Sequence, residues 1–121
     1  MNNPVLNVVM ISFEKDTRKN MSSLLMSMAE INQVSAFNSL PKAEKYLRQQ
    51  GVGFVLLDAD DEEIGWIIPF RRIKTIHPNL KIILMSSSRD AAVKAYETGV
   101  WDYLLKPVKE SQIKRIIERC R

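Results

Sequence analysis

The sequence predicts an α/β fold: a doubly wound, five-stranded parallel sheet with five helices, stacked in three αβα layers. Two kinds of segment, which alternate along the chain, lead to this prediction. Short apolar runs rich in Val, Ile and Leu alternate along the chain with stretches whose apolar residues recur at helical spacing. Because a helix separates each strand from the next, we expect neighbouring strands to pair in parallel and helices to cover both faces of the sheet.

Five short segments are predicted to be strands. The third is apolar at every position, as expected for a strand that is buried on both faces of a sheet. The others are short apolar runs placed between helical segments or turn residues, which favours strands over helices. The five segments cover residues 5–11, 34–37, 54–57, 80–85 and 101–105.

The first two predicted helices follow the first two strands. Asp16 or Thr17 is the predicted N-cap of the first helix. Ser39 is that of the second, in which Pro41 suits the first turn. In both helices the apolar residues recur at intervals of three and four, which places them on one face. They are Met21, Leu24, Leu25 and Met28 in the first helix, and Leu40, Ala43 and Leu47 in the second.

Proline, glycine and the same apolar spacing mark the other three helices. Pro69 must lie in the first turn of the third helix, because deeper in a helix it would remove a hydrogen bond and clash with the preceding turn. That helix therefore starts late and ends at His77 and Pro78. Gly99 closes a short fourth helix over residues 91–97. The last helix has Ile113, Ile116, Ile117 and Cys120 on one face.

Length and composition fit one domain that spans residues 1–121. Of the 121 residues, 45% are hydrophobic and 26% charged, which is ordinary for a globular domain with a single core. Cys120 is the sole cysteine, so no disulfide forms within the chain. The first apolar run is interrupted by Asn7 and lacks a cationic lead, unlike a signal peptide, and no apolar stretch is long enough to span a bilayer. We expect a cytoplasmic protein without membrane contact.

The charge pattern argues against a nucleic-acid-binding domain. The net charge is +4, but Lys and Arg are spread along the chain, as in solvated helix faces. The sequence shows no helix-turn-helix beyond the helices of the fold itself and no clustered basic stripe. We therefore expect no direct contact with nucleic acid.

Side chains that suit phosphoryl chemistry follow four of the five strands. In open parallel sheets, ligands bind at the carboxyl ends of the strands, near the point where the strand order reverses. Taken singly, an aspartate there is more often a turn former and a lysine a solvated charge. Together, a carboxylate can attack phosphorus while a hydroxyl and an ammonium group bind the equatorial oxygens. The candidates are Ser12, Phe13 and Glu14 after the first strand, Asp58, Asp60 and Asp61 after the third, Ser86 and Ser87 after the fourth, and Lys106 with Pro107 after the fifth.

Three segments of the chain resemble the receiver domains of bacterial two-component response regulators, and the resemblance extends over essentially the whole chain. They are FVLLD at 54–58, IILMS at 82–86 and GVWDYLLKP at 99–107, of which the last is the most specific. The resemblance implies a flavodoxin-like architecture and a signalling role rather than an enzymatic one. It also implies a histidine kinase or phosphotransfer protein as the partner that donates a phosphoryl group.

The resemblance assigns a role to each candidate that matches a motif position. Asp58 matches the phospho-accepting aspartate, and Lys106 matches the lysine that contacts the phosphoryl group. Ser86, with Ser87 beside it, matches the hydroxyl that contacts the same group and takes part in switching. Tyr103 matches the aromatic switch residue.

The same resemblance implies a switching surface and further partners. Pro107 stands where the family often has a cis peptide bond. Receivers rearrange the face built from the fourth helix, the fifth strand and the last helix, so we expect any homodimer to form through that face. We also expect an output domain or an effector protein as a partner, although no output domain lies within this chain.

One part of the receiver pattern is missing. Receivers carry an acidic pair after the first strand, and that pair holds Mg²⁺; here Ser12 and Phe13 stand at those positions. Mg²⁺ is usually held by one or two carboxylates together with water and phosphate, which leaves Asp58 and Glu14 as candidate metal ligands. The acidic run at 60–63 is expected to be a solvated loop. We therefore expect weak Mg²⁺ binding and slow phosphorylation.

Two alternatives to an ordinary receiver stay open. The first is a pseudo-receiver, an interaction module that keeps the fold but does not use Mg²⁺-dependent phosphorylation. The second is a phosphatase, because Asp58-Ala59-Asp60 after an apolar strand resembles the motif of haloacid-dehalogenase-like hydrolases. That family also needs a later acidic pair, which this sequence lacks. The Mg²⁺ affinity with and without a beryllofluoride mimic tests the first alternative, and turnover of a generic phosphomonoester tests the second.

Overall fold

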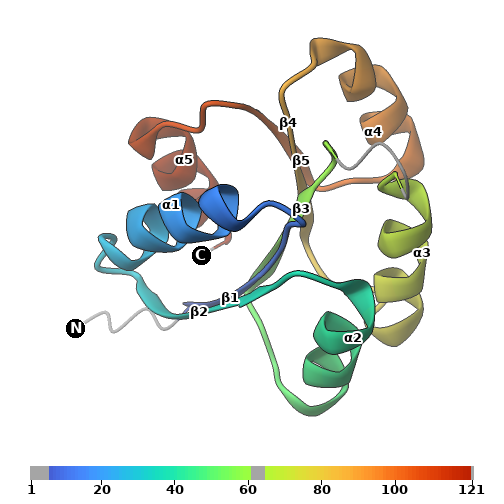
Figure 1. Ribbon diagram of the computed structural model, residues 1–121, viewed down its shortest axis with the longest axis horizontal. Coiled ribbons are helices and arrows are strands. Elements are labelled where there is room, and N and C mark those ends of the chain that lie inside the picture. The colour runs from blue at the N-terminus through green and yellow to red at the C-terminus, as the bar shows by residue number, and fades with distance from the viewer. Residues whose placement is uncertain (1–5, 61–64, 121) are drawn as a thin grey trace.

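The computed structural model describes residues 6–60 and 65–120 of the chain. Five parallel strands form one sheet in the order β2-β1-β3-β4-β5, so the predicted fold is confirmed (Figure 1). The strands are β1 (Leu6–Ile11), β2 (Ile31–Phe37), β3 (Phe54–Asp58), β4 (Ile82–Ser86) and β5 (Asp102–Leu105). The helices are α1 (Lys15–Met26), α2 (Leu40–Gln49), α3 (Ile67–Ile76), α4 (Ala92–Thr98) and α5 (Glu110–Cys120).

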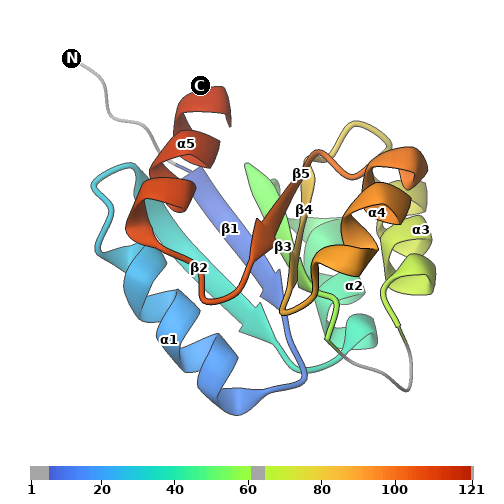
Figure 2. The same ribbon diagram turned by 90° about the horizontal axis from the view of Figure 1, so that it is seen from above.

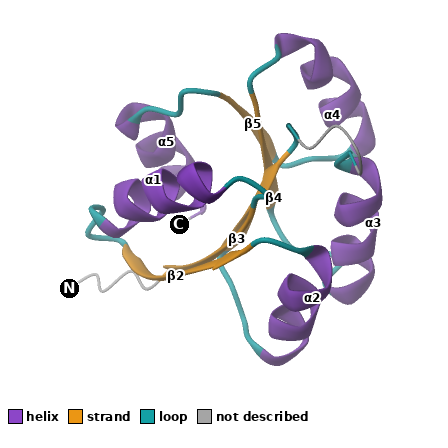
Figure 3. Cartoon of the chain, viewed as in Figure 1, coloured by secondary structure: helices purple, strands orange, loops and turns teal. Residues whose placement is uncertain are grey.

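Helices cover both faces of the sheet. Helices α1 and α5 lie against one face, and α2, α3 and α4 lie against the other (Figure 1, Figure 3). Each face has its own apolar core, and every residue of β3 and β4 is buried between the two cores. This burial explains why both central strands are apolar runs without alternation.

The strand order reverses between β1 and β3, because the chain first builds β2 on one side of β1 and then crosses to β3 on the other side. All five strands run in the same direction, so their carboxyl ends lie along one edge of the sheet (Figure 2). The loops that leave β1, β3, β4 and β5 start from that edge. The fold therefore brings the predicted site residues to a common edge.

Several element boundaries differ from the prediction. Helix α1 begins at Lys15 with Glu14 as its N-cap residue, so neither Asp16 nor Thr17 is the cap; Glu14 is extended and its carbonyl accepts the first helical hydrogen bond, from Arg18 (3.1 Å). Strand β2 starts three residues before the predicted position. It is an edge strand whose exposed polar residues interrupt the apolar run.

Other local predictions are confirmed. Pro69 lies in the first turn of α3, and Pro41 lies in the first turn of α2, whose N-cap residue is Ser39. Gly99 ends α4 with a φ of 108°, a left-handed conformation that glycine adopts without strain. A 3-10 turn over Arg89–Ala91 precedes α4. In the described part of the chain, no helix combines the length and apolar character needed to cross a membrane.

Candidate functional site

Asp58 ends β3 and is the centre of the site. Its side chain is buried, and three donors surround its carboxylate. Ser12 Oγ donates to Oδ2 at 2.7 Å, while Oδ1 accepts from Lys106 Nζ at 2.8 Å and from the backbone N–H of Asp60 at 3.0 Å. The carboxylate is thus held in one orientation by groups from β1, β5 and its own loop.

The parallel sheet fixes the positions of these donors. Ser12 follows β1, where its backbone N–H donates to Phe37 O at the end of β2 (3.0 Å), and its own carbonyl accepts from Arg18 Nη1 (2.9 Å). Lys106 follows β5, and its backbone N–H donates to Ser86 O on neighbouring β4 (2.8 Å). Each of these two backbone hydrogen bonds extends the sheet pairing by one residue beyond the end of a strand. The polar side chains of Ser12 and Lys106 are therefore held at the same edge of the sheet as Asp58.

Asp60 lies within the site, and this corrects the prediction that it belongs to a solvated acidic loop. Its carboxylate accepts from Lys106 Nζ (2.9 Å), Ser86 Oγ (3.1 Å) and Ser87 Oγ (2.7 Å). The backbone N–H of Ser87 also donates to it, at 3.0 Å and 3.2 Å. The rest of the predicted acidic run, residues 61–63, lies outside the described residues.

The charges at the site stabilise one another. Burial would raise the pKa of Asp60, but the hydrogen bonds from Ser87 and the proximity of Lys106 outweigh it and lower that pKa to about 2. Burial would likewise lower the pKa of Lys106, but its contacts with Asp58 and Asp60 raise the pKa above its ordinary value. One ammonium group is therefore shared by two carboxylates.

Tyr103 connects the loop after β4 with β5. Its ring packs against the core under α2, α3 and α4, and its hydroxyl donates a hydrogen bond to the carbonyl of Ser88. Ser88 in turn donates its backbone N–H to Ser86 Oγ (3.0 Å). The peptide bond between Lys106 and Pro107 is cis, the conformation that the resemblance implies.

The described residues lack the acidic pair that would hold a magnesium ion. Ser12 uses its hydroxyl to bind Asp58, and Phe13 is 67% exposed. The Glu14 carboxylate, predicted as a second ligand, accepts a hydrogen bond from Thr17 Oγ1 (2.8 Å) at the exposed start of α1. Over residues 6–60 and 65–120, no cluster of three or more His, Cys, Asp or Glu side chains is placed to hold a metal ion. Both oxygens of Asp58 already have donors, and the nearby cation is Lys106.

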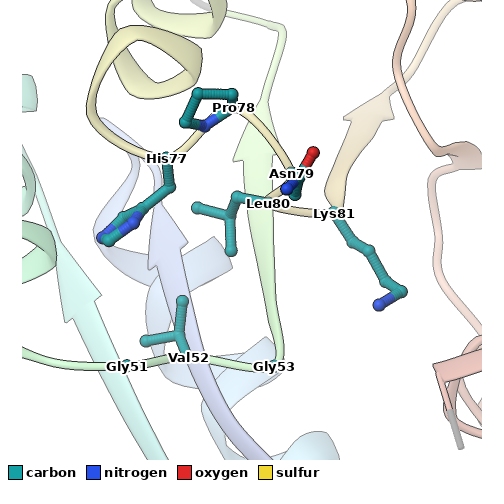
Figure 4. Close-up of a pocket in the computed structure, with 8 residues that line it drawn as sticks. All are labelled: Gly51, Val52, Gly53, His77, Pro78, Asn79, Leu80 and Lys81. Carbon is teal, nitrogen blue, oxygen red and sulfur yellow. The ribbon is translucent and has the colours of Figure 1, made fainter.

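Two hollows lie near opposite ends of the sheet. One, of about 280 Å³, borders Asp58 between the loops after β1 and β2 and the start of α3, with Phe13 and Ile68 among its lining residues. The other, of about 300 Å³, lies at the opposite edge, between the segments that lead into β3 and β4. Val52 and Leu80 point toward each other in this hollow (Figure 4). His77 Nε2 is 2.6 Å from Leu47 O, so the His77 ring contacts α2 beside this second hollow.

Sequence reasoning missed the role of Asp102, which stands within the GVWDYLLKP segment. Its buried carboxylate accepts from Arg119 Nη1 (2.7 Å), Arg115 Nη2 (3.3 Å) and the backbone N–H of Tyr103 (2.7 Å). A carboxylate within a strand is rarely buried unless it is paired, so a search of the last helix for partners could have found the two arginines. These arginines join α5 to β5.

Comparison with known proteins decides the family. The chain matches the family model of the response regulator receiver domain over residues 5–118. The chain belongs to this family. It is a receiver domain of the two-component type, and domains of this family act in signal transduction. Neither the pseudo-receiver nor the phosphatase alternative is favoured by the match.

Curated relatives of this receiver are longer proteins. The chain is 32% identical over 89 residues to the transcriptional regulatory protein ZraR of Escherichia coli, a match that covers 72% of the chain and 20% of ZraR. It is 24% identical over 119 residues to the sensory transduction protein LytR of Streptococcus mutans, covering 96% of the chain and 48% of LytR. The chain therefore spans between a fifth and a half of these relatives.

Solved receiver structures share the fold. The signal receiver domain of a response regulator from Bacteroides fragilis has a TM-score of 0.84 at 19% identity, with 94% of each chain covered. The response regulatory domain of MrkE from Klebsiella pneumoniae has a TM-score of 0.79 at 22% identity, covering 95% of this chain and 94% of that one. The receiver domain of a sensor histidine kinase from Pseudomonas aeruginosa (TM-score 0.80, 18% identity, 94% and 95% covered) has a magnesium ion coordinated in its active site cleft.

Proposed function

We propose that this receiver accepts a phosphoryl group at Asp58 from a phosphohistidine of a histidine kinase or phosphotransfer protein. The observation that carries the proposal is the Asp58 carboxylate at the carboxyl edge of the sheet, 2.8 Å from the ammonium group of Lys106. Ser86 lies at the same edge and supplies a hydroxyl. A nucleophile, a cation and a hydroxyl donor are the groups that phosphoryl capture needs.

The transfer itself requires one bond to form and one to break. A carboxylate oxygen of Asp58 attacks phosphorus, the P–N bond to the donor histidine breaks, and the imidazole leaves with the bonding electron pair. Negative charge spreads over the equatorial phosphoryl oxygens during this step. Lys106, which contacts Asp58, and the hydroxyl of Ser86, with Ser87 beside it, would bind those oxygens.

We propose that Mg²⁺ binds weakly and contributes little. Support comes from Ser12 and Phe13 at the positions of the acidic pair and from the donors that already occupy both oxygens of Asp58. A Lewis-acid metal supplies several kcal/mol in phosphoryl transfer, and losing about 3 kcal/mol of this slows a reaction by roughly a hundredfold. Phosphorylation by small donors should therefore be slow.

The experiment measures phosphorylation of the whole chain by acetyl phosphate and phosphoramidate, with and without Mg²⁺, by intact mass and site mapping. We expect slow modification at Asp58 that depends weakly on Mg²⁺ and is lost in Asp58→Asn. The matched control is Asp16→Asn, which changes an exposed carboxylate on α1 and should keep the wild-type rate. Modification that persists in Asp58→Asn would exclude Asp58 as the acceptor. Rapid, strongly Mg²⁺-dependent modification would contradict the weak metal site.

The proposal extends to location and partners. We propose that the chain is one receiver domain over residues 1–121, that it acts in the cytoplasm, and that it controls an output domain or an effector protein without touching nucleic acid itself. Support for a switching face comes from Tyr103, which joins β5 to the loop before α4. Any homodimer should use the face of α4, β5 and α5; one solved relative, the beryllofluoride-activated NtrC4 receiver domain, is a dimer.

A further inference from the structure

Asp60 occupies the donors that a phosphoryl group on Asp58 would use. We propose that the Asp60 carboxylate is a built-in stand-in for that group: it competes with phosphorylation and holds the loop after β4 in place while Asp58 is unmodified. The inference deepens the proposed function and rests on it, because it assumes that Asp58 is the phosphoryl acceptor.

The contacts of Asp60 carry the inference. Its carboxylate takes the ammonium group of Lys106 at 2.9 Å, the hydroxyl of Ser86 at 3.1 Å, and both the hydroxyl and the backbone N–H of Ser87 at 2.7 Å and 3.0 Å. Four donors at the ends of the neighbouring strands β4 and β5 thus converge on one carboxylate, which belongs to the loop after β3. A tetrahedral anion attached to Asp58 needs the same cation and the same hydroxyl.

Asp60 is placed to compete with a phosphoryl group. It is two residues beyond Asp58, and its backbone N–H already donates to Asp58 Oδ1 (3.0 Å). A phosphorylated Asp58 carries between one and two negative charges, and it would share Lys106 with the Asp60 carboxylate. Like charges repel, so we expect the phosphoryl group to weaken the contact of Asp60 with Lys106 and to compete for that ammonium group. The side chain of Asp60 is 32% exposed, which leaves it a path into water.

The same contacts reach the switching face. Asp60 binds Ser87, the neighbouring Ser88 donates its backbone N–H to Ser86 Oγ (3.0 Å), and the carbonyl of Ser88 accepts from the Tyr103 hydroxyl. The anion at position 60 is thereby connected with the aromatic residue on β5 through a single loop.

The test uses the whole chain, wild type, Asp60→Ala, Asp60→Asn and the control Asp16→Asn, all at one Mg²⁺ concentration. Two quantities are measured: the affinity for beryllofluoride, by ¹⁹F NMR, and the backbone amide resonances of Ser87 and Tyr103 without any mimic. We expect Asp60→Ala to bind beryllofluoride roughly tenfold more tightly, because Lys106 is freed from one charged hydrogen bond. We also expect the Ser87 and Tyr103 resonances to shift or broaden in both Asp60 variants and to stay unchanged in Asp16→Asn.

The outcomes separate this inference from the proposed function. An unchanged beryllofluoride affinity in Asp60→Ala, or unchanged Ser87 and Tyr103 resonances, would overturn the proposal that Asp60 competes with the phosphoryl group and holds the loop after β4. Failure of every chain to bind beryllofluoride counts against Asp58 as the acceptor, and the resonances then decide by themselves whether Asp60 holds the loop.

Discussion

Replacing Lys106 with methionine perturbs the charge balance at the centre of this site. Methionine keeps the apolar stem of the side chain but removes the ammonium group that lies 2.8 Å from Asp58 and 2.9 Å from Asp60. In Lys106→Met the two carboxylates face each other without their shared cation. The variant should be less stable than the wild type at neutral pH.

The size of this loss of stability depends on how deeply the three side chains are buried. The side chains of Asp58, Lys106 and Asp60 are 6%, 18% and 32% exposed. Removing one partner of a buried ion pair costs about 3–5 kcal/mol, whereas an exposed pair is worth only about 0–1 kcal/mol. One carboxylate here is buried and the other is about a third exposed, so we expect a loss of about 3 kcal/mol.

Urea unfolding followed by tryptophan fluorescence measures this loss. Lys114→Met is the matched control, because Lys114 pairs with Glu110 at 3.4 Å with both side chains more than half exposed; its removal should change the stability by less than about 0.5 kcal/mol. A loss below about 1 kcal/mol in Lys106→Met would refute the idea that Lys106 neutralises two carboxylates.

Two further predictions concern the acidic residues. Asp102→Ala should lower the free energy of unfolding by about 2–4 kcal/mol, because it leaves the backbone N–H of Tyr103 without its acceptor and two arginines without their carboxylate. Asp102→Asn should lose less, since it keeps a neutral acceptor; equal losses in urea unfolding would contradict this reasoning. The pKa of Asp60 falls from 3.8 to about 2 on folding, so its stabilisation is complete above about pH 4 and disappears as the pH drops toward 2. The stability difference between wild type and Asp60→Asn, measured across that range, should follow this course and reach at most about 2 kcal/mol; a difference that is constant with pH would count against it.

The absence of the acidic pair after β1 has a structural consequence for Asp58. Ser12 does not leave the end of β1 empty: it donates its hydroxyl to Asp58 and is itself buried. A neutral donor thus stabilises the Asp58 carboxylate at the place where a metal-binding receiver has an acid. Together with Lys106 and the backbone N–H of Asp60, it gives the Asp58 carboxylate three hydrogen bonds without a metal ion.

The sequence by itself determined the fold, the family and the edge of the sheet at which the site lies. Apolar runs alternating with helical spacing leave few arrangements other than a parallel sheet covered on both faces, and such a sheet collects the carboxyl ends of its strands along one edge. That is why Asp58, Ser86 and Lys106 could be grouped before any contact was known. Strand and helix limits were less well determined, because an edge strand such as β2 carries exposed polar residues that hide its start.

Only the tertiary structure decided which polar groups bind one another. Asp60 was expected in solvent, yet it binds Ser86, 26 residues away, because the loop after β3 turns its side chain back over the end of β4. Ser12 and Asp58 are 46 residues apart, and Asp102 finds its arginines on α5. Spacing along the chain predicts the direction of a side chain within a helix or strand, but it does not predict where a loop side chain points or which distant partner neutralises a buried charge. Those contacts depend on how the strands and helices pack.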